Sequence, residues 1–224
     1  MTLHAPEDIH VATINHFQKL LNDPSSAVAT PPSLHSFVSK SLSPVQASDL
    51  IKRVSYDEIK AIVFQMKPDN APGPNEYSAS FFQKSWHIVG QDVVQVISFF
   101  FYSGRLLKEL NHTSLTLAPK KLNPTKLSDF RPIACCNFFY KWISGILAAI
   151  LKAVLPSLID KAQVAFIPGQ CLSDNIFIVQ ELLTNYHRSD TQPRCTIKVD
   201  ILKAYDMEKW SFLFDLLFKL GFPL

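Results

Sequence analysis

The carboxylates near the C-terminal end of the chain are its first candidates for chemistry. Asp200 falls on the polar side of an alternating segment whose apolar positions are Cys195, Ile197, Val199 and Ile201. This alternation predicts a buried strand over residues 195–201. A carboxylate at the end of a rigid strand suits Mg²⁺, which binds a few carboxylates together with substrate phosphates. Taken alone, the residue is better explained as an Asp that faces solvent or pairs with Lys198.

Two more residues of interest follow Asp200. Asp206 directly precedes a helix that we expect from Met207 to Leu220, so its simplest role is that of an N-cap, worth roughly 1 kcal/mol. Gly221 and Pro223 would end that helix. Tyr205 lies between the expected strand and the expected helix, where an aromatic side chain is usually part of the core.

A basic segment is the third candidate. Lys120, Lys121, Lys126 and Arg131 lie close together, with Asp129 as the only acid among them. Such a cluster suits a triphosphate or a nucleic-acid backbone, because arginine presents a fork of donors to phosphate oxygens. Arg131 precedes a proline, which favours an extended backbone. Charge alone favours the simpler alternative, a solvated loop.

The elements that must position these residues begin late in the chain. Residues 1–54 are rich in proline and serine, with helical spacing only from Ile9 to Leu21, and they are predicted to be a connector. Ser55 and Glu58 form a capping box that starts a helix, and Pro68 ends it.

Apolar spacing predicts the rest of the secondary structure. Helices are expected around residues 81–86, over about 92–107, over 137–155 and after a cap at Asp174, with a short strand over 114–117. The helix over 137–155 is apolar almost all round, so we expect it to be deeply buried. The fold class is therefore α+β, helix-rich first and ending in a β-turn-α unit.

The composition excludes several classes of protein. With 47% hydrophobic and 18% charged residues, the chain is not disordered, and something normally covers part of its apolar surface. The four cysteines lack metal-ligand spacing, so we expect no zinc and reduced thiols inside a cell. No signal peptide and no apolar run of ~18 residues is present, so no membrane span is expected. Nucleus and cytoplasm are not distinguished.

A set of short sequence words runs in order along the chain. They are Ala71–Pro74, Leu117–Lys120, Asp129–Ile133, Cys136-Asn137 with Tyr140-Lys141, Gln163 with Ala165–Gly169, Asp174-Asn175, and Lys198–Asp206 with Trp210. Each word is short, but their order and spacing together are a strong signal. From Ser55 to Pro223 the chain resembles the N-terminal half of plant non-LTR (LINE-type) retrotransposon reverse transcriptases.

The resemblance implies a partial right-handed polymerase fold. Residues 55–193 would form mostly helical fingers, and residues 194–224 the first strand and helix of the palm. Residues 1–54 would be the linker that follows an upstream endonuclease. The intact family uses an RNA template, a DNA primer, deoxynucleoside triphosphates and two Mg²⁺ ions.

The resemblance also implies roles for individual residues. Asp200 would be the catalytic carboxylate and a metal ligand, with Asp206 as a structural neighbour. Tyr205 would exclude the sugar 2′-hydroxyl, while Lys120 and Arg131 would hold the incoming triphosphate.

Several positions depart from the family pattern. Asn75-Glu76 replaces the usual Asp-Gly, so a turn that needs glycine is expected to be strained there. Gln170 stands in place of an Arg, and Met207 in place of a Ser. The Asp-Asp hairpin of the family would lie beyond Leu224, so we expect the chain to be inactive alone. The leading interpretation is a truncated RNA-directed DNA polymerase, and the alternative is a non-catalytic remnant that binds nucleic acid or a partner.

Overall fold

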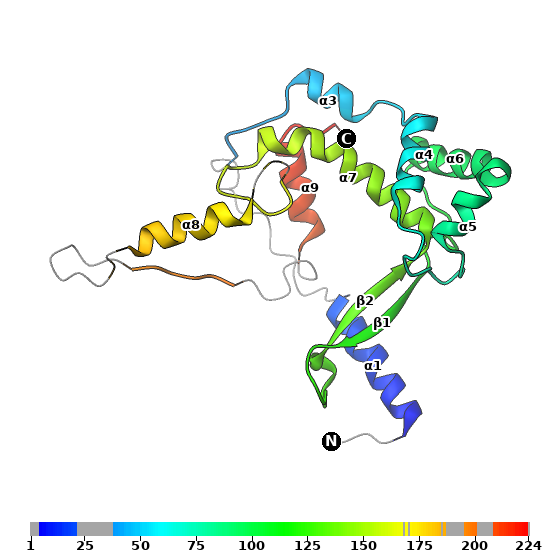
Figure 1. Ribbon diagram of the computed structural model, residues 1–224, viewed down its shortest axis with the longest axis horizontal. Coiled ribbons are helices and arrows are strands. Elements are labelled where there is room, and N and C mark those ends of the chain that lie inside the picture. Colours follow the sequence, from blue (N-terminus) through cyan, green and yellow to red (C-terminus); the bar gives the residue numbers. More distant parts are fainter. Residues whose placement is uncertain are drawn as a thin grey trace. The chain divides into compact units, whose positions relative to one another are not determined.

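The computed structural model describes residues 5–21, 38–167, 169, 171–184, 186, 195–200 and 208–223 (Figure 1). Contacts divide the chain into two compact units. One unit is residues 49–151, and the other combines residues 1–48 with residues 152–224. The predicted boundaries at residues 54 and 193 are a functional division and stay a prediction.

The unit of residues 49–151 is built around an aromatic core. Its helices are α4 (Tyr56–Gln65), α5 (Ala79–Lys84), α6 (Trp86–Ser103) and the first part of α7 (Phe138–Leu158). The core contains Phe82, Trp86, Phe138 and Trp142, and the rings of Phe82 and Trp142 meet edge to face at 4.9 Å. Ring pairs of this kind add stability beyond the area that they bury.

The start of α4 confirms the predicted capping box. The backbone N–H of Ser55 donates to the carboxylate of Glu58 at 2.7 Å, and the backbone N–H of Glu58 donates to Ser55 Oγ at 3.3 Å. The bond from the Ser55 N–H, and then a bond from Ser55 Oγ to the same carboxylate at 2.8 Å, lower the pKa of Glu58. The helix ends at Gln65, and Met66 is already extended ahead of Pro68.

The helices that follow α4 differ in their limits from the prediction. Ser78 caps α5, and a break at Ser85 separates it from α6, which begins at Trp86 rather than near residue 92. The helix ends at Ser103 because Gly104 adopts a left-handed backbone, with φ 67°. The predicted end at Leu107 is therefore wrong.

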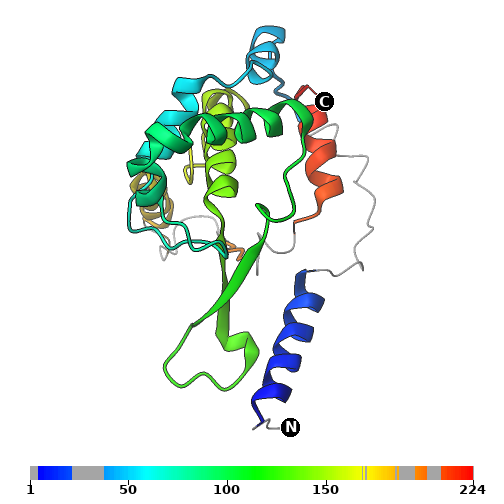
Figure 2. The ribbon, with the colours of Figure 1, turned by 90° about the vertical axis from the view of Figure 1, so that its right-hand side faces the viewer.

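The remaining part of this unit is a β-hairpin. β1 (Thr113–Pro119) pairs antiparallel with β2 (Phe130–Cys136), in a register from Thr113↔Cys136 to Pro119↔Phe130. The strand predicted over residues 114–117 is confirmed and is longer than predicted. The hairpin extends away from the helices of its own unit (Figures 1 and 2).

Helix α7 does not have the all-round burial that we predicted. Phe138 and Trp142 are fully buried, but Tyr140 and Leu147 are exposed, so one side of the helix packs on the core. By length and composition alone α7 could cross a membrane, a test that core helices of soluble proteins also pass. The expected absence of a membrane partner stays a prediction.

Besides the end of α7, the second unit contains four helices in its described residues. They are α1 (Pro6–Leu21), α3 (Pro44–Leu50, which reaches the unit boundary), α8 (Leu172–Leu183) and α9 (Trp210–Lys219). Helix α1 contains the spacing predicted from Ile9 to Leu21 and α3 was not predicted, while the role of residues 1–54 as a connector stays a prediction. Leu42 donates its backbone N–H to the Leu220 carbonyl at 2.8 Å, which ties the segment before α3 to the end of α9.

The predicted starts of the last two helices are wrong. Asp174 lies inside the first turn of α8, whose N-cap is Cys171. Helix α9 begins at Trp210, with Lys209 as its N-cap, rather than at Met207, and Asp206 lies outside the described residues. The predicted end of this helix is confirmed, since Gly221 follows it with φ 81°.

The predicted strand over residues 195–201 is also wrong within the described part, residues 195–200. This segment is irregular, and Ile197 and Val199 are 80% and 78% exposed. Alternation identifies two faces, but a strand also needs a neighbouring backbone to pair with. Among the described residues, the strand pairs are those between β1 and β2.

A basic hairpin as the candidate binding site

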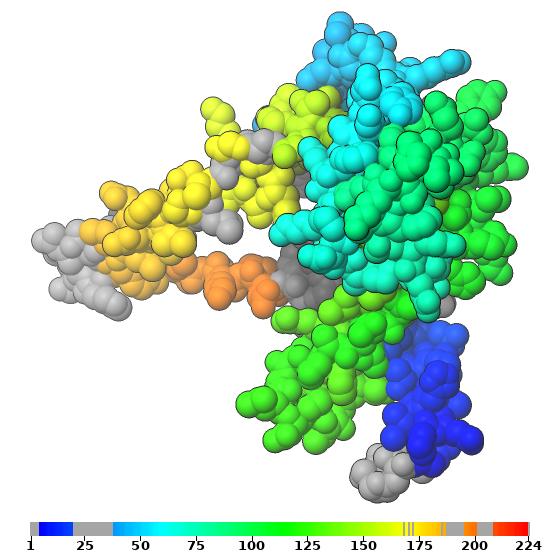
Figure 3. Space-filling view, turned by 45° about the vertical axis from the view of Figure 1, so that its right-hand side comes forward, coloured from blue at the N-terminus to red at the C-terminus, as the bar shows by residue number. Residues whose placement is uncertain are grey.

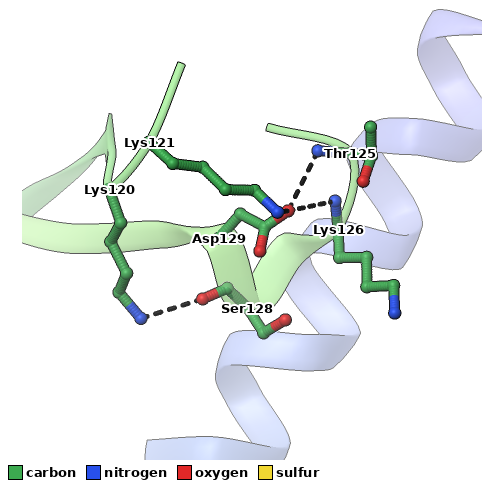
Figure 4. Close-up of polar contacts among 6 residues, drawn as sticks. All are labelled: Lys120, Lys121, Thr125, Lys126, Ser128 and Asp129. Atoms are coloured by element: carbon green, nitrogen blue, oxygen red, sulfur yellow. Dashed lines mark hydrogen bonds and ion pairs between the residues drawn. The ribbon is translucent and has the colours of Figure 1, made fainter. Parts of the chain in front are cut away.

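The loop of the hairpin is organised around the carboxylate of Asp129 (Figure 4). Lys121 Nζ lies 2.9 Å from Asp129 Oδ2, and the same oxygen accepts hydrogen bonds from the backbone N–H groups of Thr125 and Lys126, each at 3.0 Å. A short 3₁₀ turn, Leu127–Asp129, brings the carboxylate to this position. A side chain that accepts nearby backbone N–H groups fixes a tight loop, as in Asx turns.

The charge of Asp129 is stabilised by these contacts. The hydrogen bond from Lys121 and then the one from the Thr125 N–H lower the pKa of Asp129 from 3.8 to about 2. The carboxylate is therefore ionised across the physiological range. Lys121 is committed to this ion pair, which leaves it less available to an external anion.

Lys120 and Arg131 lie on one face of the hairpin. Arg131 pairs with Ala118, and Lys120 follows two residues later, so the two side chains share a side of the ladder. The pairing of the two strands continues one residue past the end of β1, because the Lys120 N–H donates to the Asp129 carbonyl at 2.7 Å. Diagonal neighbours of this kind have Cα atoms ~7–8 Å apart, within reach of one phosphate group or two adjacent ones.

The two cations differ in how strongly they are held. Lys120 Nζ donates to the carbonyl of Ser128 at 2.8 Å (Figure 4). No hydrogen bond or ion pair joins the exposed guanidinium of Arg131 to another described residue. Arg131 can therefore offer all of its guanidinium donors to an anion. Lys120 must first break its hydrogen bond to the Ser128 carbonyl.

The hairpin holds the whole net charge of the chain. The chain has 22 basic and 19 acidic residues, a net charge of +3. Residues 120–131 contain four of the basic and one of the acidic residues, so eighteen of each are found elsewhere. Figure 3 shows that the hairpin stands out from the helices of its unit, which exposes this charge to solvent. A localised positive surface attracts polyanions even where the total charge is small.

The other predicted site residues belong to other parts of the chain. Asp200 lies in the other unit, on the irregular segment of residues 195–200, and is exposed. Tyr205 and Asp206 lie outside the described residues. No three His, Cys, Asp or Glu side chains gather within the part of the chain that the structure describes. An exposed carboxylate is a suitable oxygen donor for Mg²⁺, and that role for Asp200 remains an expectation.

The turn of residues 71–76 is held by contacts with residues that are distant in the sequence. Lys141 Nζ donates to the Ala71 carbonyl at 2.7 Å, and the N–H of Asn75 donates to Asn137 Oδ1 at 3.1 Å. Glu76 adopts a φ of 60°, which confirms the predicted strain where a glycine is usual. The sequence words Ala71–Pro74 and Cys136-Asn137 with Tyr140-Lys141 are thus partners in space.

Comparison with known proteins relates part of this chain to a known family. Residues 118–224 match the family described as reverse transcriptase (RNA-dependent DNA polymerase). The chain is also similar to the "Transposon TX1 uncharacterized 149 kDa protein" of Xenopus laevis, with 27% identity over 160 residues. That alignment covers 71% of this chain and 12% of the relative.

Residues 118–224 are therefore part of a reverse transcriptase domain. This match and the similarity to a transposon protein support a chain that contains a reverse transcriptase domain of retrotransposon origin. The mixture of helices and a two-stranded sheet agrees with part of such a domain. The narrower resemblance to plant elements finds no support in an amphibian relative.

Proposed function

We propose that this chain contributes nucleotide-binding and metal-binding residues to an RNA-directed DNA polymerase with the right-handed polymerase fold. Its partners would be an RNA template, a DNA primer and deoxynucleoside triphosphates. The observation that supports this most is the position of Lys120 and Arg131 on one face of a hairpin within the matched residues. Cations in this arrangement can bind the phosphates of an incoming nucleotide.

Nucleotide transfer depends mainly on position and on neutralised charge. Arg131 would bind phosphate oxygens bidentately, and Lys120 would add a second positive charge beside them. The Asp129–Lys121 pair would keep the loop in shape without competing for the nucleotide. Asp200 would supply a carboxylate to Mg²⁺, which when bound neutralises phosphate charge and activates the primer hydroxyl. Tyr205 would select against ribonucleotides.

The test is DNA synthesis on an RNA template. Residues 1–224 are joined to the remaining palm and thumb of a related active enzyme, and primer extension is measured. Asp200→Asn should abolish synthesis, while Asp215→Asn, a matched change on α9, should leave it unchanged. Tyr205→Ala should admit ribonucleotides. Synthesis that is indifferent to Asp200 would contradict the proposal, and tight nucleic-acid binding by an inactive chimera would favour a non-catalytic role.

A further inference from the structure

We infer that a cavity away from the basic hairpin binds an unpaired segment of nucleic acid. The cavity lies in the unit of residues 49–151 and has a volume of ≈ 820 Å³. Its walls are residues 50–54, which precede α4, and five residues of α6: Gln95, Ser98, Phe99, Phe101 and Tyr102. The volume falls within the range of small-ligand sites, roughly 300–1,000 Å³.

One wall of the cavity is a single face of α6. Gln95, Ser98, Phe99 and Tyr102 are spaced three and four residues apart, so their side chains follow one stripe of the helix. Val54 and Phe101 also pack against the core of the unit and therefore form the floor. The cavity thus has a fixed apolar floor and a wall that mixes aromatic, amide and hydroxyl groups.

The aromatic rings of the wall are open to solvent. Phe99 is 55% exposed and Tyr102 is 86% exposed. Exposed rings beside a groove stack well on nucleobases, and this stacking tolerates any base sequence because every base has a flat face. The amide of Gln95 and the hydroxyl of Ser98 can satisfy polar base edges. A base inside a duplex has its faces covered, so the cavity suits unpaired strands.

The charge of the cavity also fits a polyanion. Lys52 and Arg53 are its charged lining residues, and none of its lining residues is acidic. Lys52 forms an ion pair with Asp49 at 2.6 Å. The exposed side chain of Arg53 has no hydrogen bond or ion pair with another described residue, so it can bind a phosphate. An apolar peptide would cover the rings but would leave Arg53 without a partner, whereas a nucleic-acid strand offers both bases for the rings and a phosphate for Arg53.

The experiment compares single-stranded and duplex DNA of one length and fluorescent label, titrated with the full chain and followed by anisotropy. The basic hairpin contacts phosphates, which both ligands carry, so it does not by itself create a preference. Tyr102→Ala should weaken single-strand binding roughly tenfold and leave duplex binding unchanged, since stacking contributes only to unpaired bases. Tyr102→Trp should preserve the preference. Tyr140→Ala, an exposed aromatic of the same unit outside the cavity, is the matched control.

A second measurement locates the strand directly. Single-stranded DNA that carries 5-iodouracil should crosslink under ultraviolet light to Phe99 or Tyr102, as read by peptide mass spectrometry. Arg53→Ala should lower the crosslink yield, and Lys67→Ala should not. Unchanged single-strand preference in Tyr102→Ala, or crosslinks confined to the hairpin, would overturn the inference. These outcomes do not depend on polymerase activity, so the proposed function can fail while this inference stands.

Discussion

The side chain of Asn137 forms hydrogen bonds with the turn residue Asn75 and with the loop after α6. It therefore connects the start of α7 to both segments. Its Oδ1 accepts the N–H of Asn75 at 3.1 Å, and its Nδ2 donates to the carbonyls of Glu109 and Leu110 at 3.1 and 3.3 Å. Asn137 is 1% exposed, so water cannot replace these bonds. A Cβ atom on Gly73 would overlap the same side chain, which leaves glycine as the residue that fits there.

Asn137→Ala should therefore lower the free energy of unfolding by about 1–3 kcal/mol, because buried backbone groups lose their partners. Asn137→Asp is the informative companion. It keeps an acceptor for Asn75 but loses both donors, so it should also destabilise the fold. Urea unfolding followed by tryptophan fluorescence measures both, since Trp86 and Trp142 lie in the core of this unit. A loss from Asn137→Ala of only a few tenths of a kcal/mol would contradict this account.

Glu76→Gly should stabilise the protein. Glu76 has a φ of 60°, and a residue with a Cβ atom loses about 1–2 kcal/mol in this left-handed region. Glycine removes this cost, but its greater freedom in the unfolded chain offsets part of the effect. We therefore expect the free energy of unfolding to rise by about 1 kcal/mol. Glu76→Ala removes the charge but keeps the strain and should give no such gain. Equal effects from both variants would refute the strain.

Lys121→Met should raise the pKa of Asp129, which Lys121 lowers more than any other contact. The pKa in the native protein, about 2, lies below the ordinary value of 3.8. The contribution of this carboxylate to stability is therefore complete above pH 3.8 and is lost as the pH falls toward 2. Carboxyl NMR titration measures the shift. Lys126→Met is the matched control, since Lys126 contacts Asp129 through its backbone N–H.

Lys120→Ala and Arg131→Ala should each weaken nucleic-acid binding without regard to sequence. Each phosphate contact releases a counterion, so each substitution should reduce the slope of log K against log salt by about 1. The loss should be larger for Arg131, because Lys120 already donates to the Ser128 carbonyl. Lys60→Ala on α4 is a suitable control. Affinity that does not change with salt would rule out this mode of binding.

The sequence predicts the parts of the fold whose cause is local. The box of Ser55 and Glu58 and the stop at Gly221 both appear as expected, because a cap depends on a few adjacent residues. The prediction of a strand over residues 195–201 is wrong for the opposite reason. The alternation of this segment is local, but a strand requires pairing with distant backbone. β2 was expected only as an extended run at Arg131, because Pro132 argues against an ordinary strand.

The candidate site was predicted only in part. The charge of Lys120 and Arg131 was evident, but their shared face depends on the register of two strands that the sequence does not specify. The structure also shows that Asp129 fixes the loop, where the sequence suggested only an opposing charge. The partnership of Asn137 with the turn at Asn75 joins residues 62 positions apart, beyond the reach of a spacing argument.

The prolines of the hairpin have a consequence for assembly. Pro119 and Pro132 each lie at non-hydrogen-bonded positions of the ladder, because the bond from Lys120 to Asp129 sets the alternation. Their nitrogen atoms therefore face outward, one on each free edge, and neither can donate to a further strand. Both edges near the loop are protected against the edge-to-edge pairing that starts amyloid-like growth. An exposed two-stranded arm can thus stay monomeric and keep its cations available for a ligand.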